Sequence, residues 1–261
     1  MISAQHFSID HDMTHSEFIK TKYFPNLDFL RFLAISTVVW YHTAEKIEPT
    51  SIGVLRYGFA GVWLFFVVSG FLITSLLLRE LRNTKTLDLK LFLIRRALRI
   101  FPLYYLVLLL YVVLVSVLEP DGAAKDSFFD NLPFFLTYTS NLFVPLTGER
   151  TIFYFSWSLA VEEQYYLVWP LILLLLGWRW GIIILSALVA LVIFNFLVGF
   201  GETGMPNQLL MNAIHLPILL GSLLALTMDN KFGFGLVKKL AGFPYSVIIY
   251  SALLVLSLIH I

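Results

Sequence analysis

The sequence contains no cysteine and few charges. Without cysteine, the chain can form no disulfide bond, no thiolate metal site and no cysteine nucleophile. Charged residues make up only 13% of the 261 residues, and 18 Lys and Arg against 17 Asp and Glu give a net charge of +1. A charge this small indicates no polyanionic partner, so we expect no nucleic-acid binding. We also expect no metal site.

Apolar residues take the place of the missing charges. They make up 59% of the chain, and the mean hydropathy is +0.82, whereas soluble domains have about 45–50% apolar residues. Several runs reach the roughly 20 apolar residues that a membrane-spanning helix needs. The alternating segments of about 10 residues that are typical of a membrane β-barrel are absent. The sequence therefore predicts an all-α, polytopic transmembrane helix bundle.

Two domains are expected. Residues 1–24 are polar and lack the apolar core of a cleavable signal peptide, so we expect a short, mobile, cytoplasmic N-terminal tail. Residues 25–261 then form one transmembrane domain. The chain ends inside an apolar run, which we interpret as the end of a fragment, with the domain incomplete at its C-terminus.

Seven candidate spans can be placed in this domain. They cover roughly residues 26–44, 57–79, 100–118, 157–178, 180–200, 208–228 and 244–261. The apolar stretch within 119–155 is interrupted by polar residues and proline, so we interpret it as interfacial or re-entrant.

Charge placement favours this topology. With a cytoplasmic N-terminus, 14 of the 18 Lys and Arg fall on the inner side and 4 on the outer side, as the positive-inside rule expects. If residues 119–155 also crossed the membrane, the division would be 10 against 8.

The first span carries ionisable residues, which are costly in a membrane and often functional. Arg31 and His42 are eleven positions apart, which places them within about 20° of the same helix face and roughly 16 Å apart along the axis. Asp28 can pair with Arg31. The alternative is that Arg31 only reaches the inner headgroups and His42 only sits at the outer interface.

A second segment, 57–77, contains Gly58, Gly61 and Gly70. Small residues allow close helix packing or close approach of a ligand. We assign no role to Ser69.

The stretch 79–105 is the most basic part of the chain. The 3–4 spacing of Phe92, Arg95, Arg96 and Arg99 predicts that they share most of one helical face. Arginine binds phosphate through two parallel hydrogen bonds, so a phosphate-bearing ligand is one interpretation. An anchor for anionic lipids is the other.

The stretch 155–170 places two adjacent carboxylates at the head of a predicted helix. Ser158, Glu162 and Tyr165 share one face, and Glu163 and Tyr166 form a second row beside it. A carboxylate beside an imidazole stabilises the imidazolium, which makes the histidine a better base. The alternative is that the glutamates only favour the positive N-terminal end of the helix.

These segments together resemble the membrane-bound acyltransferase-3 family, integral membrane O-acyltransferases that modify cell-surface glycans and other acceptors. The resemblance extends from about residue 26 to the end. It rests on LDFLRFLAISTVVWYH (27–42), GVWLFFVVSGFLIT (61–74), FLIRRALRIFPLYY (92–105) and SWSLAVEEQYYLVWP (156–170), in this order.

The resemblance implies transfer of an acyl group, expected to be acetyl, from cytoplasmic acyl-CoA to a hydroxyl of an extracytoplasmic acceptor such as a surface polysaccharide or glycolipid. By likeness, His42 is the essential histidine and Arg31 its paired arginine. The cluster Arg95, Arg96 and Arg99 corresponds to arginines of donor binding. Glu162 and Tyr165 correspond to the acidic motif near the histidine. We expect Glu163 to be catalytic together with His42 and Glu162, and Ser158 to bind substrate together with Tyr165 and the arginines.

Further expectations follow from the same resemblance. Acyl-CoA is a co-substrate, so no bound cofactor is expected, and the protein lies in the inner (plasma) membrane. The chain departs from the family in two ways: Trp63 occupies a position that is polar in many relatives, and seven spans are present where the family has about ten. Two other classes also fit intramembrane charges, namely a transporter of an anionic or lipid-linked substrate and a non-catalytic membrane scaffold or sensor.

Overall fold

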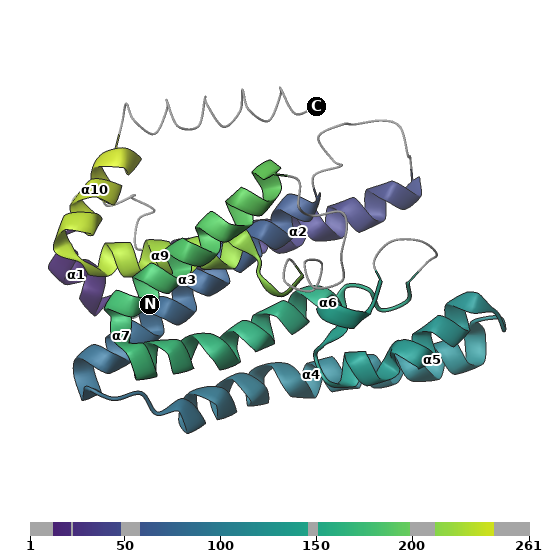
Figure 1. Cartoon of the computed structure of the whole chain (residues 1–261). Coiled ribbons are helices and arrows are strands. Elements are labelled where there is room, and N and C mark those ends of the chain that lie inside the picture. Colours follow the sequence, from purple (N-terminus) through teal and green to yellow (C-terminus); the bar gives the residue numbers. More distant parts are fainter. Residues whose placement is uncertain (1–12, 22, 48–57, 146–150, 199–211, 243–261) are drawn as a thin grey trace, which may run out of the picture.

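The computed structural model describes residues 13–21, 23–47, 58–145, 151–198 and 212–242. Every regular element in these residues is a helix (Figure 1), which confirms the predicted all-α bundle. In chain order the helices are α1 (His15–Lys20), α2 (Pro25–Ile47), α3 (Gly58–Thr84), α4 (Leu89–Leu118), α5 (Ala123–Leu136), α6 (Ser140–Phe143), α7 (Ser156–Val198), α9 (Leu216–Asp229) and α10 (Lys231–Ala241).

Within the described residues, three helices are long and apolar enough to cross a membrane, namely α3, α4 and α7, and α9 is a shorter apolar helix. Six of the predicted spans overlap α2, α3, α4, the two halves of α7, and α9. The seventh, 244–261, lies outside the described residues. The chain is therefore a membrane-embedded helical protein.

Helix α7 consists of two helices that fold back on each other. They join at Gly177, whose φ of 77° and ψ of 171° interrupt the helix in a conformation that glycine adopts readily. Beyond it, a Cβ added at Gly181 would lie 3.0 Å from Leu173 and 3.2 Å from the Trp169 ring. In one straight helix, Gly181 and Trp169 would be about 18 Å apart. This reversal, visible in Figure 1, agrees with the two separate spans predicted here.

Helix α5 runs beside α4 in the opposite direction (Figure 1). Its 14 residues extend over about 21 Å, which is less than the hydrocarbon core of about 30 Å. The Tyr104 hydroxyl donates to the Phe135 carbonyl at 2.7 Å, and the Tyr105 hydroxyl donates to the Leu136 carbonyl at 2.9 Å. Helix α5 is therefore too short to cross the membrane, which agrees with the interfacial or re-entrant segment predicted within 119–155.

Helix α3 lies at the centre of the bundle and packs against α2 and α9. Its contact with α9 depends on small residues, because a Cβ at Gly221 would overlap the Val67 carbonyl oxygen and a Cβ at Gly70 would overlap the Ile218 carbonyl oxygen. The Ser222 hydroxyl donates to the Gly70 carbonyl at 3.0 Å across the same contact. The expectation that glycines in this segment allow close packing is confirmed for Gly70.

Helix α1 packs onto one end of the bundle. Its Phe18 is 8% exposed and lies against Phe71 and Phe234, with ring centres 6.5 and 5.4 Å away. The predicted N-terminal tail thus includes a short packed helix, while residues 1–12 and Lys22 lie outside the described residues.

Polar contacts fasten the same end. The Arg79 guanidinium donates to the Thr21 carbonyl, and Arg82 forms an ion pair with Asp229. The His15 Nε2 lies 2.9 Å from the Asp229 carbonyl oxygen. Segments far apart in the sequence are therefore held together where the charge pattern predicts the inner surface.

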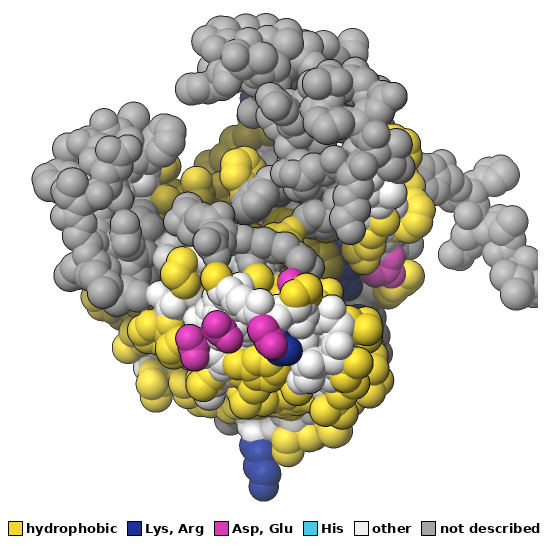
Figure 2. All heavy atoms as spheres, turned by 90° about the vertical axis from the view of Figure 1, so that its right-hand side faces the viewer, with side chains coloured by type: hydrophobic (Ala, Val, Ile, Leu, Met, Phe, Trp, Pro, Cys, Tyr) yellow, Lys and Arg dark blue, Asp and Glu magenta, His cyan; other side chains and the backbone are white. Residues whose placement is uncertain are grey.

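The outer faces of the helices are apolar. On α4, Leu98, Leu103 and Val117 are 71%, 66% and 74% exposed. Figure 2, a view onto one end of the molecule, shows hydrophobic side chains over much of the coloured surface, with a few acidic and basic ones among them. Such a surface would be a liability in water, but in a bilayer it contacts lipid tails.

The packing of α3 against α9 leads to a stability prediction. We expect Gly221→Val to destabilise the protein by more than about 3 kcal/mol, because the new side chain has no space beside Val67. Gly235→Ala is the matched control, since a Cβ there meets nothing within 4 Å. Thermal unfolding in detergent should separate the two, and equal melting temperatures would contradict the described helix contact.

Candidate active site

The predicted site residues are carried by three neighbouring helices. Helix α2 contains Arg31 and His42, α4 contains the arginine cluster, and the first half of α7 contains the two glutamates. The side chain of His42 lies outside what the structure describes, so only its position on α2 is known. The other predicted side chains can be placed directly.

Glu162 is buried in the bundle, with 3% of its surface exposed. One carboxylate oxygen, Oε2, accepts a hydrogen bond of 3.2 Å from the Tyr166 hydroxyl. Ser69 of α3 lies beside both side chains, and Arg31 of α2 is close enough for its charge to act on the carboxylate. Arg31 also faces Asp28 at 3.7 Å, as its spacing predicted.

Arg96 occupies the other side of α7. Its guanidinium carbon lies 5.7 Å from the centre of the Phe92 ring and 5.6 Å from the centre of the Tyr166 ring, which is cation–π distance. Its charge interacts with that of Glu163. The adjacent glutamates thus face different arginines, because neighbouring residues on a helix point about 100° apart.

The predicted common face of the basic stretch is divided in the structure. Arg96 and Phe92 face α7, whereas the Arg95 side chain is 55% exposed and lies 3.9 Å from Glu80. Arg99 is exposed. Of the three predicted donor-binding arginines, Arg96 is the one whose charge acts on Glu163.

Unpartnered polar atoms gather around these charges. Within the described residues, buried side-chain atoms without a hydrogen-bond partner occur on six residues, and five of them belong to this region. The five atoms are Arg31 Nε, Ser69 Oγ, Tyr138 OH, Glu162 Oε1 and Glu163 Oε1. Buried polar groups are nearly always paired, so this concentration indicates a site that a ligand or water completes.

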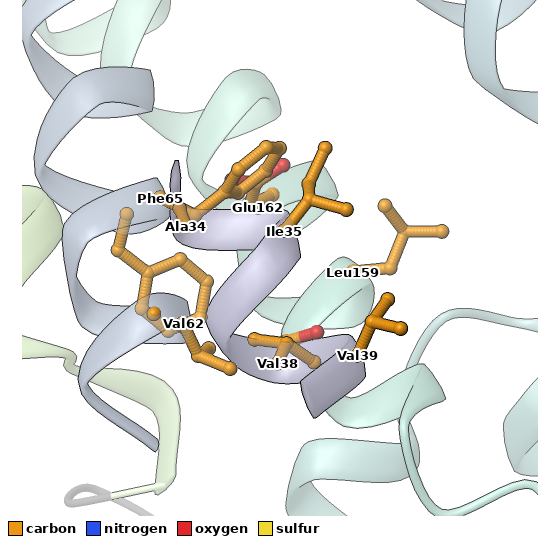
Figure 3. Close-up of a pocket in the computed structure, with 11 residues that line it drawn as sticks. Ala34, Ile35, Val38, Val39, Val62, Phe65, Leu159 and Glu162 are labelled. Carbon is orange, nitrogen blue, oxygen red and sulfur yellow. The ribbon is translucent and has the colours of Figure 1, made fainter. Parts of the chain in front are cut away.

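A cavity of about 190 Å³ opens beside Glu162. Figure 3 shows it between α2, α3 and α7, with Ala34 and Val38 on one wall and Phe65 and Leu159 on others. Its lining is apolar except for Glu162 and Ser158. The cavity therefore suits an apolar group that carries one polar function at the level of the carboxylate.

The α2 residues of this wall continue the face predicted to join Arg31 and His42. Ala34 follows Arg31 by three positions, and His42 follows Val38 by four, so each pair is about one helical turn apart. The cavity thus lies between the levels of the two predicted residues along α2.

The two remaining predicted residues have different surroundings. Ser158 lines the cavity, and its hydroxyl donates to the Phe155 carbonyl at 3.1 Å. The Tyr165 hydroxyl lies 2.5 Å from Ser222 Oγ, and the Tyr165 ring stacks on Trp169 at 5.9 Å. Tyr165 therefore packs towards α9 and not towards the charges.

The arrangement also differs in depth from the expectation that arginines lie at the inner end and carboxylates at the outer end. Arg31, Arg96 and Glu162 each lie about two turns inside their helices, so the two charge types meet within the bundle. Among the described residues, no three His, Asp or Glu side chains come together as metal ligands would.

Comparison with known proteins identifies the family. The model of a family described as an acyltransferase domain matches residues 24–261. The chain belongs to this acyltransferase-3 family. Family membership confirms the resemblance drawn from the four sequence segments.

Three relatives illustrate the likeness. The chain is 35% identical over 159 residues to the peptidoglycan O-acetyltransferase OatA of Listeria monocytogenes serovar 1/2a, which covers 59% of this chain and 24% of OatA. It is 34% identical over 158 residues to the putative peptidoglycan O-acetyltransferase YrhL of Bacillus subtilis strain 168, covering 58% and 24%. A putative O-acetyltransferase of Staphylococcus aureus strain COL is 34% identical over 168 residues, covering 62% and 26%.

These acyltransferase-3 relatives are much longer than the matched region, which makes up about a quarter of their length. No solved structure matches the chain significantly.

Two members of the site, Ser69 and Tyr138, were not predicted from the sequence. Tyr166 was predicted in the row of Glu163, but its hydroxyl donates to Glu162, four positions before it. Ser69 was assigned no role because nothing in a small-residue segment distinguishes a packing serine from one that faces a charge. Tyr138 lies between two short helices, and its position depends on long-range contacts.

Glu162 should reduce stability in the absence of a ligand. A buried carboxylate with an unpartnered oxygen is costly to desolvate, and an amide of the same shape costs less. We expect Glu162→Gln to stabilise the protein by about 1–2 kcal/mol, measured as a higher melting temperature in detergent. The control Asp130→Asn, on the exposed side of α5, should change nothing. A lower melting temperature for Glu162→Gln would show that the carboxylate is fully satisfied.

Proposed function

We propose that the chain is part of an acyl-CoA-dependent membrane O-acyltransferase. It transfers an acyl group, acetyl in the first instance, from cytoplasmic acyl-CoA to a hydroxyl of an extracytoplasmic glycan or lipid-linked acceptor. The protein lies in the plasma membrane with its N-terminus in the cytoplasm. The observation that carries this proposal is the group of unpartnered polar atoms around Glu162 and Glu163, beside an apolar cavity on the face that joins Arg31 to His42.

The donor follows this face in our proposal. Its phosphates bind Arg96 and Arg31, whose forks suit phosphate oxygens, with Arg95 and Arg99 contributing from the exposed side. The pantetheine arm then lies in the cavity along α2, which is mostly apolar. This path brings the thioester towards His42, one turn beyond Val38. Acyl-CoA acts as a co-substrate, and the proposal includes no bound cofactor.

His42 acts as the general base. It takes the proton of the acceptor hydroxyl, the oxygen attacks the thioester carbonyl, and coenzyme A leaves as a thiolate that receives a proton from the imidazolium. Glu162 or Glu163 stabilises that imidazolium, since a carboxylate nearby favours the charged form. Ser158 and Tyr165 complete the binding region.

The acceptor is proposed from the relatives. OatA is a peptidoglycan O-acetyltransferase, and YrhL bears the same description as a putative one. Peptidoglycan fragments are therefore the first acceptors to test. An extracytoplasmic acceptor also agrees with the charge pattern, which favours the outer side for the head of α7.

The histidine provides the first test of the proposal. In the full-length protein, His42→Ala should lower acyl transfer from acetyl-CoA to peptidoglycan fragments by at least about 100-fold, since general-base catalysis contributes about 10²–10⁴-fold. The neighbouring Thr43→Ala, an exposed position on the same helix, should retain activity. Transfer by His42→Ala at the wild-type rate would contradict the mechanism. Movement of substrate without consumption of acyl-CoA would favour a transporter.

Arg96 and Arg95 provide a second test, because the structure separates them. Arg96→Ala should weaken acyl-CoA binding by at least about tenfold, since a charge-assisted contact is worth about 1.5–3 kcal/mol. Arg95→Ala, at an exposed side chain, should change it less than about threefold. Calorimetric titration of the purified protein with acetyl-CoA measures both. Unchanged affinity in both variants would return the arginines to the lipid-anchor interpretation, and equal losses would contradict the different roles that the structure indicates for Arg95 and Arg96.

A further inference from the structure

Tyr138, between α5 and α6, has a backbone conformation that is unusual for a large side chain. Its φ is 53°, in the left-handed region that non-glycine residues seldom occupy. Residues held in such conformations cluster at functional sites, where the surroundings enforce them. The backbone conformation of Tyr138 therefore indicates a functional position.

Two sets of contacts hold Tyr138 in place. The Gln164 side-chain amide donates to the Tyr138 carbonyl at 2.8 Å and also to Asn141 Oδ1 at 2.9 Å. The Tyr138 ring stacks on Tyr104 and Phe101, with ring centres 4.3 and 5.2 Å apart. Because Gln164 follows Glu163 directly, the backbone of Tyr138 is fastened next to one of the glutamates.

The hydroxyl of Tyr138 is the part that these contacts leave unused. Tyr138 is 7% exposed, and within the described residues its hydroxyl has no hydrogen-bond partner. The neighbouring Tyr104 and Tyr105 hydroxyls both donate to carbonyls of α5. Glu163 Oε1 is also buried without a partner, and Glu163 and Tyr138 are close enough to interact electrostatically.

A third chemical group could form hydrogen bonds with both Glu163 Oε1 and the Tyr138 hydroxyl. The carboxylate oxygen needs a donor, and the phenol, a donor itself, needs an acceptor. Burial raises the pKa of Tyr138 above its ordinary value, so the phenol keeps its proton. A carbonyl or phosphate offers no donor, and an ammonium offers no acceptor. A hydroxyl group, of an alcohol or of water, offers both.

We propose that Tyr138 and Glu163 together bind a second hydroxyl of the acceptor, next to the one that is acylated; this second hydroxyl donates to Glu163 Oε1 and accepts from the Tyr138 hydroxyl. This assignment rests on the proposed acyl transfer and adds an acceptor-binding residue to it. It divides the two glutamates between substrates, since Glu162 faces the donor cavity.

The test compares Tyr138→Phe with Tyr105→Phe in the full-length protein. The Tyr138→Phe variant keeps the ring stacking and the backbone bond to Gln164, so its melting temperature should not change. With saturating acetyl-CoA and peptidoglycan fragments as the varied substrate, we expect kcat/KM for the acceptor to fall at least tenfold. The Kd for acetyl-CoA should stay within twofold. Tyr105→Phe loses a hydroxyl that already has a protein partner, and its acceptor kinetics should stay within twofold of the wild type.

Three results would overturn the assignment. One is unchanged acceptor kinetics for Tyr138→Phe. Another is a change in acetyl-CoA affinity alone, which would place Tyr138 in the donor site. The third is a change only in the slow hydrolysis of acetyl-CoA without acceptor, which would mean that the pair holds water. If the wild-type protein transfers no acetyl group to any tested acceptor, the proposed function itself fails, which is a distinguishable result.

Discussion

Two arginines, Arg31 and Arg96, and two glutamates, Glu162 and Glu163, lie inside a helix bundle whose outer faces are mostly apolar. Taking such ions out of water costs several kcal/mol each unless they are paired and hydrogen-bonded. Here the charges are close enough to interact, but no ion pair within 4 Å joins Arg31 or Arg96 to Glu162 or Glu163 in the described part of the chain. The spacing leaves room between opposite charges, and the rest of the bundle has to be stable enough to hold them apart.

The packing of the other helices supplies that stability. Glycines bring α3 and α9 into backbone contact, and α1 fastens the end of the bundle where α3 and α9 finish. Further along, the paired amides of Gln164 and Asn141 join α7 to α6. Buried charges at a functional site commonly lower the stability of a protein. Here the contacts that stabilise the bundle lie around the site and not within it.

Much of this architecture could be predicted from the sequence. Apolar run length and charge asymmetry indicated the helical class and the boundaries of most spans. Helical spacing placed Arg31 and Asp28 together and put Glu162 and Glu163 on separate rows. Periodicity could not show where α4 begins within the bundle, so the depth at which Arg96 meets Glu163 was not foreseen.

Contacts between distant segments also could not be predicted from the sequence. Tyr165 shares a face with Glu162 by spacing, yet it packs on α9, because the helix that covers a face is decided by tertiary packing. Tyr138 reaches the site only because Gln164, Tyr104 and Phe101 hold it in a left-handed conformation. No local sequence pattern predicts such a set of long-range contacts.

The central claim is that the acyl-CoA donor lies along α2, between the arginines and His42. Photo-crosslinking tests it most directly, with an acyl-CoA analogue that carries a diazirine near its thioester and mass spectrometry to identify the labelled residues. The account predicts labelling of the cavity wall, at Val38, Phe65 and Leu159, and competition by unlabelled acetyl-CoA. Labelling confined to the lipid-facing side of α4, or labelling that acetyl-CoA does not reduce, would contradict it.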